Sequence, residues 1–518
     1  MSEEKSRKEY VRNRWIKENS IEKREYQEAI AENAIKANTL CVLPTAMGKT
    51  IIALLIVTKA LDKDMNRKIL FIAPTRPLVE QHKNSFEKFL KLGLNIVAIT
   101  GKIDPAEREK LYKFNDIIFA TPQSVQNDLK KRILNLSGFS LLVVDEAQHS
   151  VGNYAYTFVA SKFIEQTKLS GKPGTIVGLT ASPSGRYSKI NEIRQNLFIK
   201  NVEIRSEKDV DVRDYVQDVD TDWVEVTMTP EMEKARNLLI EMKDDRVKAL
   251  MAWHIIHSPM ISKSQALELQ KKLSRTKSGF SFAAMSVLAE IIKLDYALEL
   301  LETQTIASMM EYLGKISENA SAKRSKADAR IAKDERFFRV MDYAREIRTH
   351  PKLDKLKEIV GKELKNPDTR IMIFAQFRLT VKRIKEVLEE IPECKPVLLV
   401  GQSGKDGLKQ DEQIKLISMY DSGFYNTLIT TSIGEEGIHL GSATTAIFYE
   451  AVPSEIRSIQ RRGRIGREKS GKLYVLMTKK TRDEAYFWSA HNKEKKMKKI
   501  LEGMKTQTDL TKFEQDNK

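Results

Sequence analysis

Short apolar runs alternate with helix-like segments along the first part of this chain, from Leu40 to about Lys200. Runs of this length are typical of buried strands, and strands that alternate with helices predict a parallel sheet covered by helices on both faces. The expected strands are Thr39–Leu43, Lys68–Ala73, Asn95–Ile99, Asp116–Ala120, Leu141–Val144 and Thr175–Leu179.

A second series of apolar runs begins near His350. The same architecture is therefore predicted twice in the chain, although the two series share no residue-level repeat. The expected strands of this series are Ile371–Phe374, Pro396–Val400, Asn426–Thr430, Thr445–Tyr449 and Lys472–Met477.

The segment between the two series has a helical pattern. No proline occurs between Pro259 and Pro351, and glycine appears only at Gly279 and Gly314. Steps of four and three place one apolar stripe along a helix, which favours packing against other helices over a ligand groove. The stripe consists of Val287, Ile291, Leu294, Leu298 and Leu301.

The predicted fold class is therefore α/β, with two parallel-sheet domains and an all-helical insertion between them. A chain of 518 residues is too long for one core and suggests about three domains. The expected boundaries are 1–205 for the first α/β domain, 206–229 for a connector, 230–349 for the insertion, 350–500 for the second α/β domain and 501–518 for a polar tail.

Composition and charge narrow the class of protein. Hydrophobic residues at 41% and charged residues at 31% are typical of a soluble globular chain. The longest apolar run, Ile51–Val57, is far shorter than the roughly 20 residues that cross a bilayer, so we expect no membrane span and a cytoplasmic location. Cys41 and Cys394 lie in separate strand-like contexts, and His254 and His257 lack further ligands nearby, so neither a disulfide nor a zinc site is expected.

The formal net charge of +17 favours a polyanionic partner, with nucleic acid as the leading candidate. Basic side chains that merely solvate helix faces would give the same excess. Charge alone leaves these two interpretations about even, and the motifs have to decide between them.

The strongest motif is LPTAMGKT, Leu43–Thr50, between an expected strand and an expected helix. This placement is the one that a phosphate-binding loop requires, because backbone N–H groups of the loop and the helix N-terminus can surround phosphates. Lys49 adds a point charge, and Thr50 is a candidate ligand for Mg²⁺. The remaining candidates for nucleotide binding are Pro44, Thr45, Ala46, Met47 and Gly48.

A second motif, LLVVDEAQ at Leu141–Gln148, brings two carboxylates to the end of a buried strand. Asp145 is placed to hold Mg²⁺, and Glu146 to orient and deprotonate an attacking water. Alone, such a pair would be read as a helix N-cap. Together with the upstream GKT, it indicates hydrolysis of a nucleoside triphosphate.

A third motif, QRRGRIGR at Gln460–Arg467, lies near the end of the second α/β series. Basic runs are usually surface patches, but Arg464 and Arg467 are three residues apart and can face one site on a helical turn. Arginine supplied across a cleft stabilises a transferring phosphoryl group. The second domain is thus expected to complete the catalytic site of the first.

With these motifs in order, the chain resembles the superfamily 2 helicases and translocases from about Glu22 to Lys495. The resemblance implies two RecA-like domains that close on one ATP and its Mg²⁺. It implies that Gln27 recognises adenine, that Gln460 senses the γ-phosphate, and that Thr180–Ser182 couples hydrolysis to movement.

The family's nucleic-acid-contacting motifs also have matches, in short loops at strand ends. Hydroxyl and N–H groups at such loops can hold phosphates without reading bases, as movement along any sequence requires. The matching residues are Thr75, Arg76, Pro77, Thr100, Gly101, Thr121, Pro122, Phe377, Arg378, Gly401, Gln402, Thr431 and Ser432.

Within the superfamily, the insertion and the segments IEKREYQ, TSIGEEGI and TRDEAYFWSA most resemble the helicase part of the archaeal Hef and FANCM group. This resemblance implies an ATP-dependent DNA helicase or translocase that acts on forked, branched or duplex DNA in repair and fork remodelling. It also implies a monomer associated with the nucleoid of an archaeal cell. The insertion is expected to grip duplex DNA through a basic face formed by Lys323, Arg324, Lys326, Arg330 and Lys333.

Two alternatives stay open at this point. The insertion is also similar to that of the RIG-I and Dicer helicases, which would make the chain a double-stranded-RNA-dependent ATPase. Departures from the family pattern, with Gln148 in place of histidine and His439 in place of aspartate, would suit a branched-DNA-binding scaffold with weakened hydrolysis. No nuclease motif follows the second domain, so cleavage is not expected of this chain, and either a longer natural protein or a separate nuclease or repair-factor partner would supply it.

Overall fold

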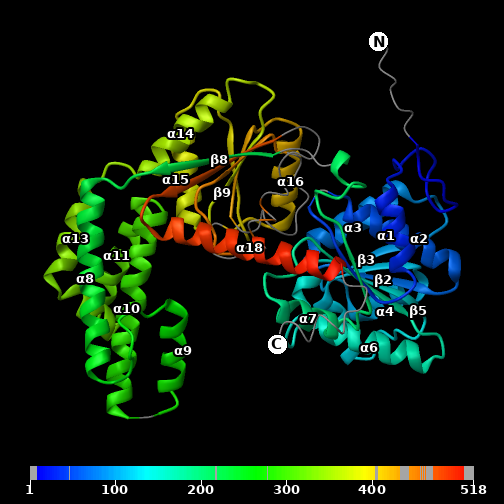
Figure 1. The fold of residues 1–518 in the computed structure, drawn as a ribbon, viewed down its shortest axis with the longest axis horizontal. Helices are drawn as coiled ribbons and strands as arrows, with labels where there is room; N and C mark the ends of the chain where they lie inside the picture. Colours follow the sequence, from blue (N-terminus) through cyan, green and yellow to red (C-terminus); the bar gives the residue numbers. More distant parts are fainter. Residues whose placement is uncertain are drawn as a thin grey trace.

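The computed structural model describes residues 9–45, 47–215, 219–276, 278–402, 407–431, 443–454 and 471–506, together with Arg457, Ile459 and Arg461. Two α/β domains lie side by side, and a helical arm extends from the second domain on the side away from the first (Figure 1). The fold is the predicted one: two parallel sheets with a helical insertion between them in sequence.

The first sheet has seven parallel strands in the order β3-β4-β2-β5-β6-β1-β7. Its strands are β1 (Thr39–Val42), β2 (Lys68–Ile72), β3 (Ile96–Ile99), β4 (Ile117–Ala120), β5 (Phe139–Val144), β6 (Thr175–Thr180) and β7 (Asn201–Ile204). Its helices are α1 (Glu25–Ala34), α2 (Lys49–Lys63), α3 (Arg76–Phe89), α4 (Pro105–Phe114), α5 (Pro122–Lys130), α6 (Ala155–Leu169) and α7 (Tyr187–Asn196), with 3-10 turns at Ala147–His149 and Arg213–Tyr215.

The strands of this sheet are apolar at successive positions because helices cover both faces. Cys41 packs into a core with α1, α2 and α3, whereas its neighbours Leu40 and Val42 pack into a second core with α5, α6 and α7. Side chains alternate between the faces of a strand, so both sets must be apolar in a doubly covered parallel sheet.

The second sheet has six parallel strands in the order β10-β11-β9-β12-β13-β8. Its strands are β8 (Val219–Val226), β9 (Ile371–Phe374), β10 (Pro396–Leu399), β11 (Thr427–Thr430), β12 (Thr445–Phe448) and β13 (Gly471–Thr478), and its helices include α14 (Pro351–Glu363), α15 (Arg378–Leu388) and α16 (Gln410–Asp421). The expected connector 206–229 therefore needs correction, since β8 pairs with β13 along its whole length and belongs to this sheet.

The insertion consists of α8 (Pro230–Ala252), α9 (Lys263–Leu273), α10 (Gly279–Thr303), α11 (Ile306–Ser321), α12 (Lys326–Ala332) and α13 (Glu335–Glu346). It begins sharply at Thr229, whose hydroxyl accepts a hydrogen bond from Met232 N, with Pro230 in the first turn. Every residue of the predicted apolar stripe on α10 is buried, as expected for a helix that packs against other helices.

The last helix, α18 (Arg482–Thr506), starts beside β13 and runs toward the first domain (Figure 1). Met497, Leu501 and Met504 enter a core of the first domain, and Lys505 forms an ion pair with Asp209 at 2.6 Å. The expected polar tail 501–518 is thus wrong for its first residues, which form the end of this helix. In the described part of the chain, no helix is both long enough and apolar enough to span a membrane.

Candidate functional sites

The strand order of the first sheet groups the predicted ATP-site residues at one edge. Strands β1, β6 and β5 are neighbours, and their carboxyl ends lead into the phosphate-binding loop, Thr180 and Asp145 respectively. Ligands of parallel α/β sheets bind outside the carboxyl ends of the strands. Three sequence segments that are far apart in the chain therefore meet at one place.

The phosphate-binding loop depends on a glycine in the left-handed region. Gly48 has φ 72° and ψ 37°, and α2 begins at the next residue, Lys49. The backbone angle favours glycine, and a Cβ at Gly48 would lie 2.5 Å from Nε2 of Gln27, so a larger residue would also displace the end of that side chain. Pro44, Thr45 and Thr50 are half-buried around the loop, whereas Ala46 lies outside the described residues.

Gln27 on α1 lies directly against this loop. Its amide Nε2 is 3.4 Å from the carbonyl oxygen of Met47, and the hydroxyl of Tyr26 donates to the same oxygen at 2.9 Å. Gln27 is only 3% exposed, so α1 and the loop form one packed unit. The residue expected to recognise adenine is thus attached to the loop expected to bind the phosphates.

Asp145 is held by a residue that the sequence motifs did not reveal. Nε2 of His82, on α3, lies 2.8 Å from Asp145 Oδ2, and both side chains are buried. Burial opposes ionisation of Asp145, but the hydrogen bond and charge of His82, with the charge of Lys49, hold the pKa of this carboxyl below its ordinary value. The only signal in the sequence was that His82 directly follows the motif APTRPLVEQ.

Glu146 has a backbone conformation that is unusual for a residue with a side chain. Its φ of 49° and ψ of 54° lie in the left-handed region, which costs about 1–2 kcal/mol for non-glycine residues. Residues held in such conformations cluster at functional sites, where surrounding structure maintains them. The conformation supports the assignment of Glu146 to catalysis.

Gln148 connects two of the predicted motifs. Its Nε2 donates to Glu146 Oε2 at 2.7 Å, and its Oε1 accepts from the hydroxyl of Thr180 at 2.7 Å. The hydroxyl of Thr180 in turn accepts from the backbone N–H of Ser182 at 3.1 Å. Gln148 therefore joins the carboxylate predicted to be catalytic to the segment expected to couple hydrolysis to movement.

The donor set suits Mg²⁺ and a triphosphate. Mg²⁺ prefers oxygen ligands and binds through one or two carboxylates together with phosphates. Asp145 supplies a carboxylate with a lowered pKa, and Thr50 supplies a hydroxyl at the start of α2. From the second domain, the predicted residues Gln460, Arg464 and Arg467 lie outside the described residues, as does His439.

The other half of the first sheet carries the predicted nucleic-acid contacts. Strands β3, β4 and β2 are neighbours, and the loops after them contain Thr100 and Gly101, Thr121 and Pro122, and Thr75 to Pro77. A Cβ on Gly101 would lie 3.5 Å from Nη2 of Arg76, which shows that two of these loops touch. The predicted ATP residues and the predicted nucleic-acid residues thus occupy different halves of one sheet edge.

The second domain repeats this arrangement at the ends of β9, β10 and β11. Arg378 donates from Nη2 to the carbonyl of Gly401 at 2.7 Å, and Thr431 follows β11. Ser432 lies outside the described residues. Phe377 differs from expectation, because its ring packs 6.0 Å from that of Tyr296, among core residues of the insertion. Its side chain is therefore assigned to packing between domains.

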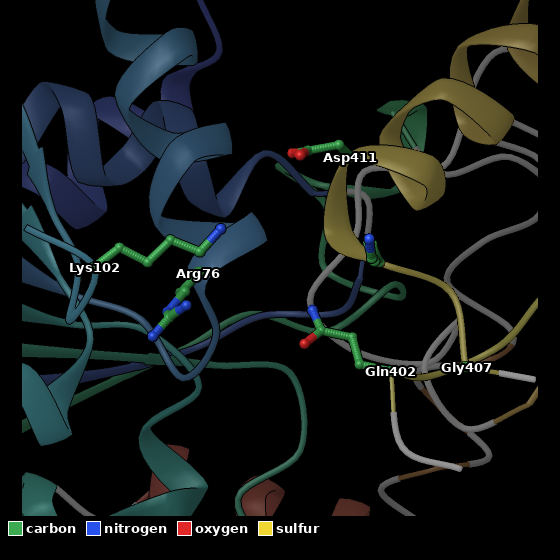
Figure 2. A pocket seen from close by; sticks show the side chains of 6 residues that line it. Arg76, Lys102, Gln402, Gly407 and Asp411 are labelled. Carbon is green, nitrogen blue, oxygen red and sulfur yellow. The ribbon is translucent and has the colours of Figure 1, made fainter. Parts of the chain in front are cut away.

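A cavity of about 320 Å³ lies between the two α/β domains (Figure 2). Arg76 and Gln402, both predicted contacts, face it from opposite domains. The cavity is also lined by Lys102, Gly407, Lys409 and Asp411, which the motifs did not include. Three cations and one carboxylate make this a basic cleft. Lys102 could have been predicted as a contact from the sequence, because it directly follows Thr100 and Gly101.

Comparisons with known families cover the three parts of the chain separately. Residues 24–190 match the DEAD/DEAH box helicase family, and residues 351–469 match the helicase conserved C-terminal domain. Residues 231–349 match a helical-bundle family provisionally attributed to ATP-dependent RNA helicases.

Among relatives, the chain is 40% identical over 96% of its length to a Methanocaldococcus jannaschii protein provisionally named an ATP-dependent RNA helicase, and spans 63% of that protein. It is 31% identical over 90% of its length to the ATP-dependent DNA helicase fml1 of Schizosaccharomyces pombe, and spans 58% of it. The chain thus covers about three fifths of these curated relatives.

A solved structure covers nearly the same extent. The helicase domain of Hef from Pyrococcus furiosus is 38% identical, with a TM-score of 0.68, over 90% of this chain and 98% of that domain. A second structure, the helicase MrfA bound to DNA, is 13% identical with a TM-score of 0.57 and shows the fold alone.

Proposed function

We propose that this chain, which belongs to the superfamily 2 helicases of the Hef and FANCM group, uses ATP hydrolysis to move along DNA and remodel forked or branched substrates. The observation that carries the proposal is the division of one sheet edge between the predicted ATP residues and the predicted nucleic-acid residues, with Arg76 of the second group facing the second domain across the cavity. Closure of the two RecA-like domains on ATP would at the same time change the shape of the basic cleft between them. ATP binding would thereby be coupled to the grip on nucleic acid, as a motor requires.

Hydrolysis is assigned to the residues at the ends of β1 and β5. Lys49 and the N-terminus of α2 bind the phosphates, and Glu146 orients the attacking water. Mg²⁺, held by Thr50 and Asp145, would neutralise charge that develops on the phosphates. Arg464 and Arg467 would complete the site from the second domain, in a segment that directly follows the described Arg461 by sequence.

The cleft between the domains is proposed to hold one nucleic-acid strand by its backbone. Arg76, Lys102 and Lys409 supply positive charge there, and glycine and threonine residues at the strand ends supply N–H and hydroxyl donors. No base-reading element is needed for such contacts. Affinity should therefore depend strongly on salt and weakly on base sequence.

The insertion is proposed to bind duplex DNA beside the two motor domains. Lys323, Arg324, Lys326 and Lys333 are exposed on or beside α12, whereas Arg330 is ion-paired with Glu290 at 3.1 Å. The exposed residues can address phosphates of a second arm of a fork. We further propose that the chain acts as a monomer on nucleoid DNA of an archaeal cell, and that any strand cleavage is performed by a nuclease or repair factor outside this chain.

Double-stranded RNA is the second candidate substrate, because one relative carries an RNA helicase name and the insertion family is attributed to RNA helicases. The test is the ATPase rate of the chain with single-stranded, duplex, forked and four-way DNA and with double-stranded RNA. The proposal expects the largest stimulation with forked or four-way DNA. Preferential stimulation by RNA would favour the second candidate, and tight fork binding without stimulated turnover would indicate a scaffold.

A further inference from the structure

A buried polar cluster lies where the insertion meets the second α/β domain, away from the catalytic carboxylates. Each of its residues is at most 1% exposed. Charged side chains are almost never fully buried without a partner, because removing them from water costs several kcal/mol. A cluster of this kind needs either a structural or a functional reason. Its members are Gln304, Lys352, Glu450, Arg461 and Asp483.

Arg461 is fixed in this cluster through Glu450, which follows β12. Its Nη1 donates to the backbone carbonyl of Glu450 at 3.2 Å, and its Nη2 lies 3.6 Å from Glu450 Oε1. The guanidinium also lies over the rings of Phe374 and Phe448, at 5.5 and 5.4 Å from their centroids. Electrostatic and cation–π contacts therefore hold one end of Arg461 in the core of the domain.

Arg461 lies within the QRRGRIGR motif, so its contacts bear on the residues of that motif. It directly follows Gln460 and precedes Arg464 by three residues, so it belongs to the segment assigned to ATP hydrolysis. Backbone geometry limits how far consecutive residues can separate. Whatever fixes Arg461 therefore fixes a described residue within that motif.

The insertion reaches the same cluster through the end of α10. Gln304, the residue after α10, directs Nε2 toward Glu450 Oε2 at 3.5 Å and accepts from the hydroxyl of Thr380 at 2.8 Å. Lys352, at the start of α14, donates to the carbonyl of Thr303 at 3.3 Å and forms an ion pair with Asp483 of α18. Helices α10, α14 and α18 thus meet around Glu450.

We propose that Glu450 is a positioning residue for ATP hydrolysis, because it holds Arg461, which lies in the same motif as Arg464 and Arg467. Gln304 connects Glu450 to the insertion. Nucleic acid bound to the insertion would therefore alter the rate of hydrolysis through this contact. Both links rest on the proposed function: the link to Arg461 rests on the assignment of Arg464 and Arg467 to hydrolysis, and the link to the insertion rests on nucleic-acid binding there. Burial and the charge of Asp483 raise the pKa of Glu450 to about 7, against the opposing effects of Arg461, Lys352 and Gln304. The group is thus poised between neutral and charged forms and depends on its partners.

The test compares two variants with a matched control in the full chain. Glu450→Gln keeps the size of the side chain and removes its charge. Gln304→Ala removes the link to the insertion and leaves the charges in place. Asp295→Asn, the control, weakens a different contact of the insertion, namely the ion pair of Asp295 with Arg482 at 2.8 Å.

For Glu450→Gln, we expect kcat to fall about tenfold or more, because arginine placement acts on the transition state, while affinity for a fluorescent ATP analogue stays within about twofold. For Gln304→Ala, the ratio of DNA-stimulated to basal kcat should fall about threefold or more. Asp295→Asn should retain the parent ratio. A Glu450→Gln,Arg461→Gln double variant should be no slower than the slower single variant, because both changes break one link.

Thermal unfolding separates this role from a purely structural one. If Glu450→Gln lowers the unfolding temperature while the folded enzyme keeps the parent kcat, or if kcat and ATP affinity fall together, the positioning role is wrong. If Glu450→Gln fails to fold, Gln304→Ala decides: an unchanged stimulation ratio overturns the link to the insertion. Should no nucleic acid stimulate the parent, the proposed function fails, but the effect of Glu450→Gln on basal kcat is still measurable.

Discussion

At the scale of single residues, polar contacts within and outside the familiar motifs support the predicted ATP site. His82 holds Asp145, Gln148 joins Glu146 to Thr180, and Tyr26 donates to the phosphate-binding loop. These contacts fix the catalytic groups before any substrate arrives, which is how buried polar networks support preorganised sites. Two predictions belong to this scale.

The first concerns Glu146. Glu146→Gln should lower kcat for ATP about 10²-fold or more and leave ATP bound, because the amide can fill the same space but cannot accept a proton from water. Phosphate release and the affinity of a fluorescent ATP analogue measure the two effects. As a comparison, Lys49→Ala should weaken binding as well, since it removes a charge from the phosphates. Turnover of Glu146→Gln near the parent rate would show that another group activates the water.

The second concerns His82. His82→Ala should raise the Mg²⁺ concentration needed for half-maximal ATPase activity by about tenfold, because partners of metal ligands typically contribute this much to metal affinity. His82→Gln should recover part of the loss, since its amide can donate to Asp145. Mg²⁺-dependent binding of the ATP analogue gives an independent readout. An unchanged Mg²⁺ requirement in His82→Ala would restrict His82 to packing.

At the scale of elements, helix ends carry the junctions between domains. The buried His350 precedes α14; its Nδ1 accepts from Lys352 N at 3.2 Å, so its Nε2 donates to the carbonyl of Leu301 at 3.2 Å. Helix α14 of the second domain is thereby attached to the end of α10 in the insertion. The junction requires a neutral imidazole.

This requirement predicts acid sensitivity. Burial and the neighbouring charge of Lys352 lower the pKa of His350 from 6.5 to about 3, so the unfolded chain binds a proton there before the folded protein does. The stabilisation is complete above about pH 6.5 and is lost as pH falls toward 3, by up to about 1.4 kcal/mol per pH unit. His350→Asn, which keeps an N-cap acceptor, should be less stable at pH 7 and lose less stability down to pH 5.

Thermal unfolding at pH 7, 6 and 5 measures this difference. His257→Gln is the control, because His257 is exposed in the insertion and should leave the pH dependence of the parent unchanged. Equal slopes for His350→Asn and the parent would mean that other groups cause the loss.

At the scale of the whole molecule, strand β8 and helix α18 connect the two α/β domains. Strand β8 comes from the segment after the first domain and pairs into the second sheet, and α18 returns from the second domain to a core of the first. The domains are therefore joined by two crossings, one in each direction along the chain (Figure 1). When one domain moves relative to the other, the chain must therefore bend or slide at the two crossings formed by β8 and α18.

The prediction at this scale concerns the basic face of the insertion. Replacing Lys323, Arg324, Lys326 and Lys333 with glutamine should weaken binding to forks and four-way junctions about tenfold, with a smaller loss for single strands. The slope of log affinity against log salt for branched DNA should also become shallower, because fewer phosphates are neutralised. Fluorescence anisotropy over a salt series measures both.

A matched control replaces four exposed lysines of the first domain, Lys91, Lys131, Lys168 and Lys172. They lie at or beyond the ends of α3, α5 and α6, at the edge of the sheet opposite the cleft, because these helices run back from the carboxyl ends of the strands. This variant has the same net charge as the test variant. Equal losses for both would show that charge in general, and not the insertion, governs branch affinity.

Local sequence patterns were enough to predict the two α/β series, the helical insertion and the motifs at strand ends. Apolar periodicity follows from local burial, and the phosphate-binding loop follows from local backbone chemistry at Gly48 and Lys49, so both can be read along the chain. The tertiary structure decided which segments meet. Half of the residues of the edge strand β8 are polar and only its last residue is buried, so it lacked the apolar run of a buried strand. The contacts of His82 with Asp145 and of Glu450 with Arg461 depend on strand order and on the packing of α3 and α10, which no local pattern encodes.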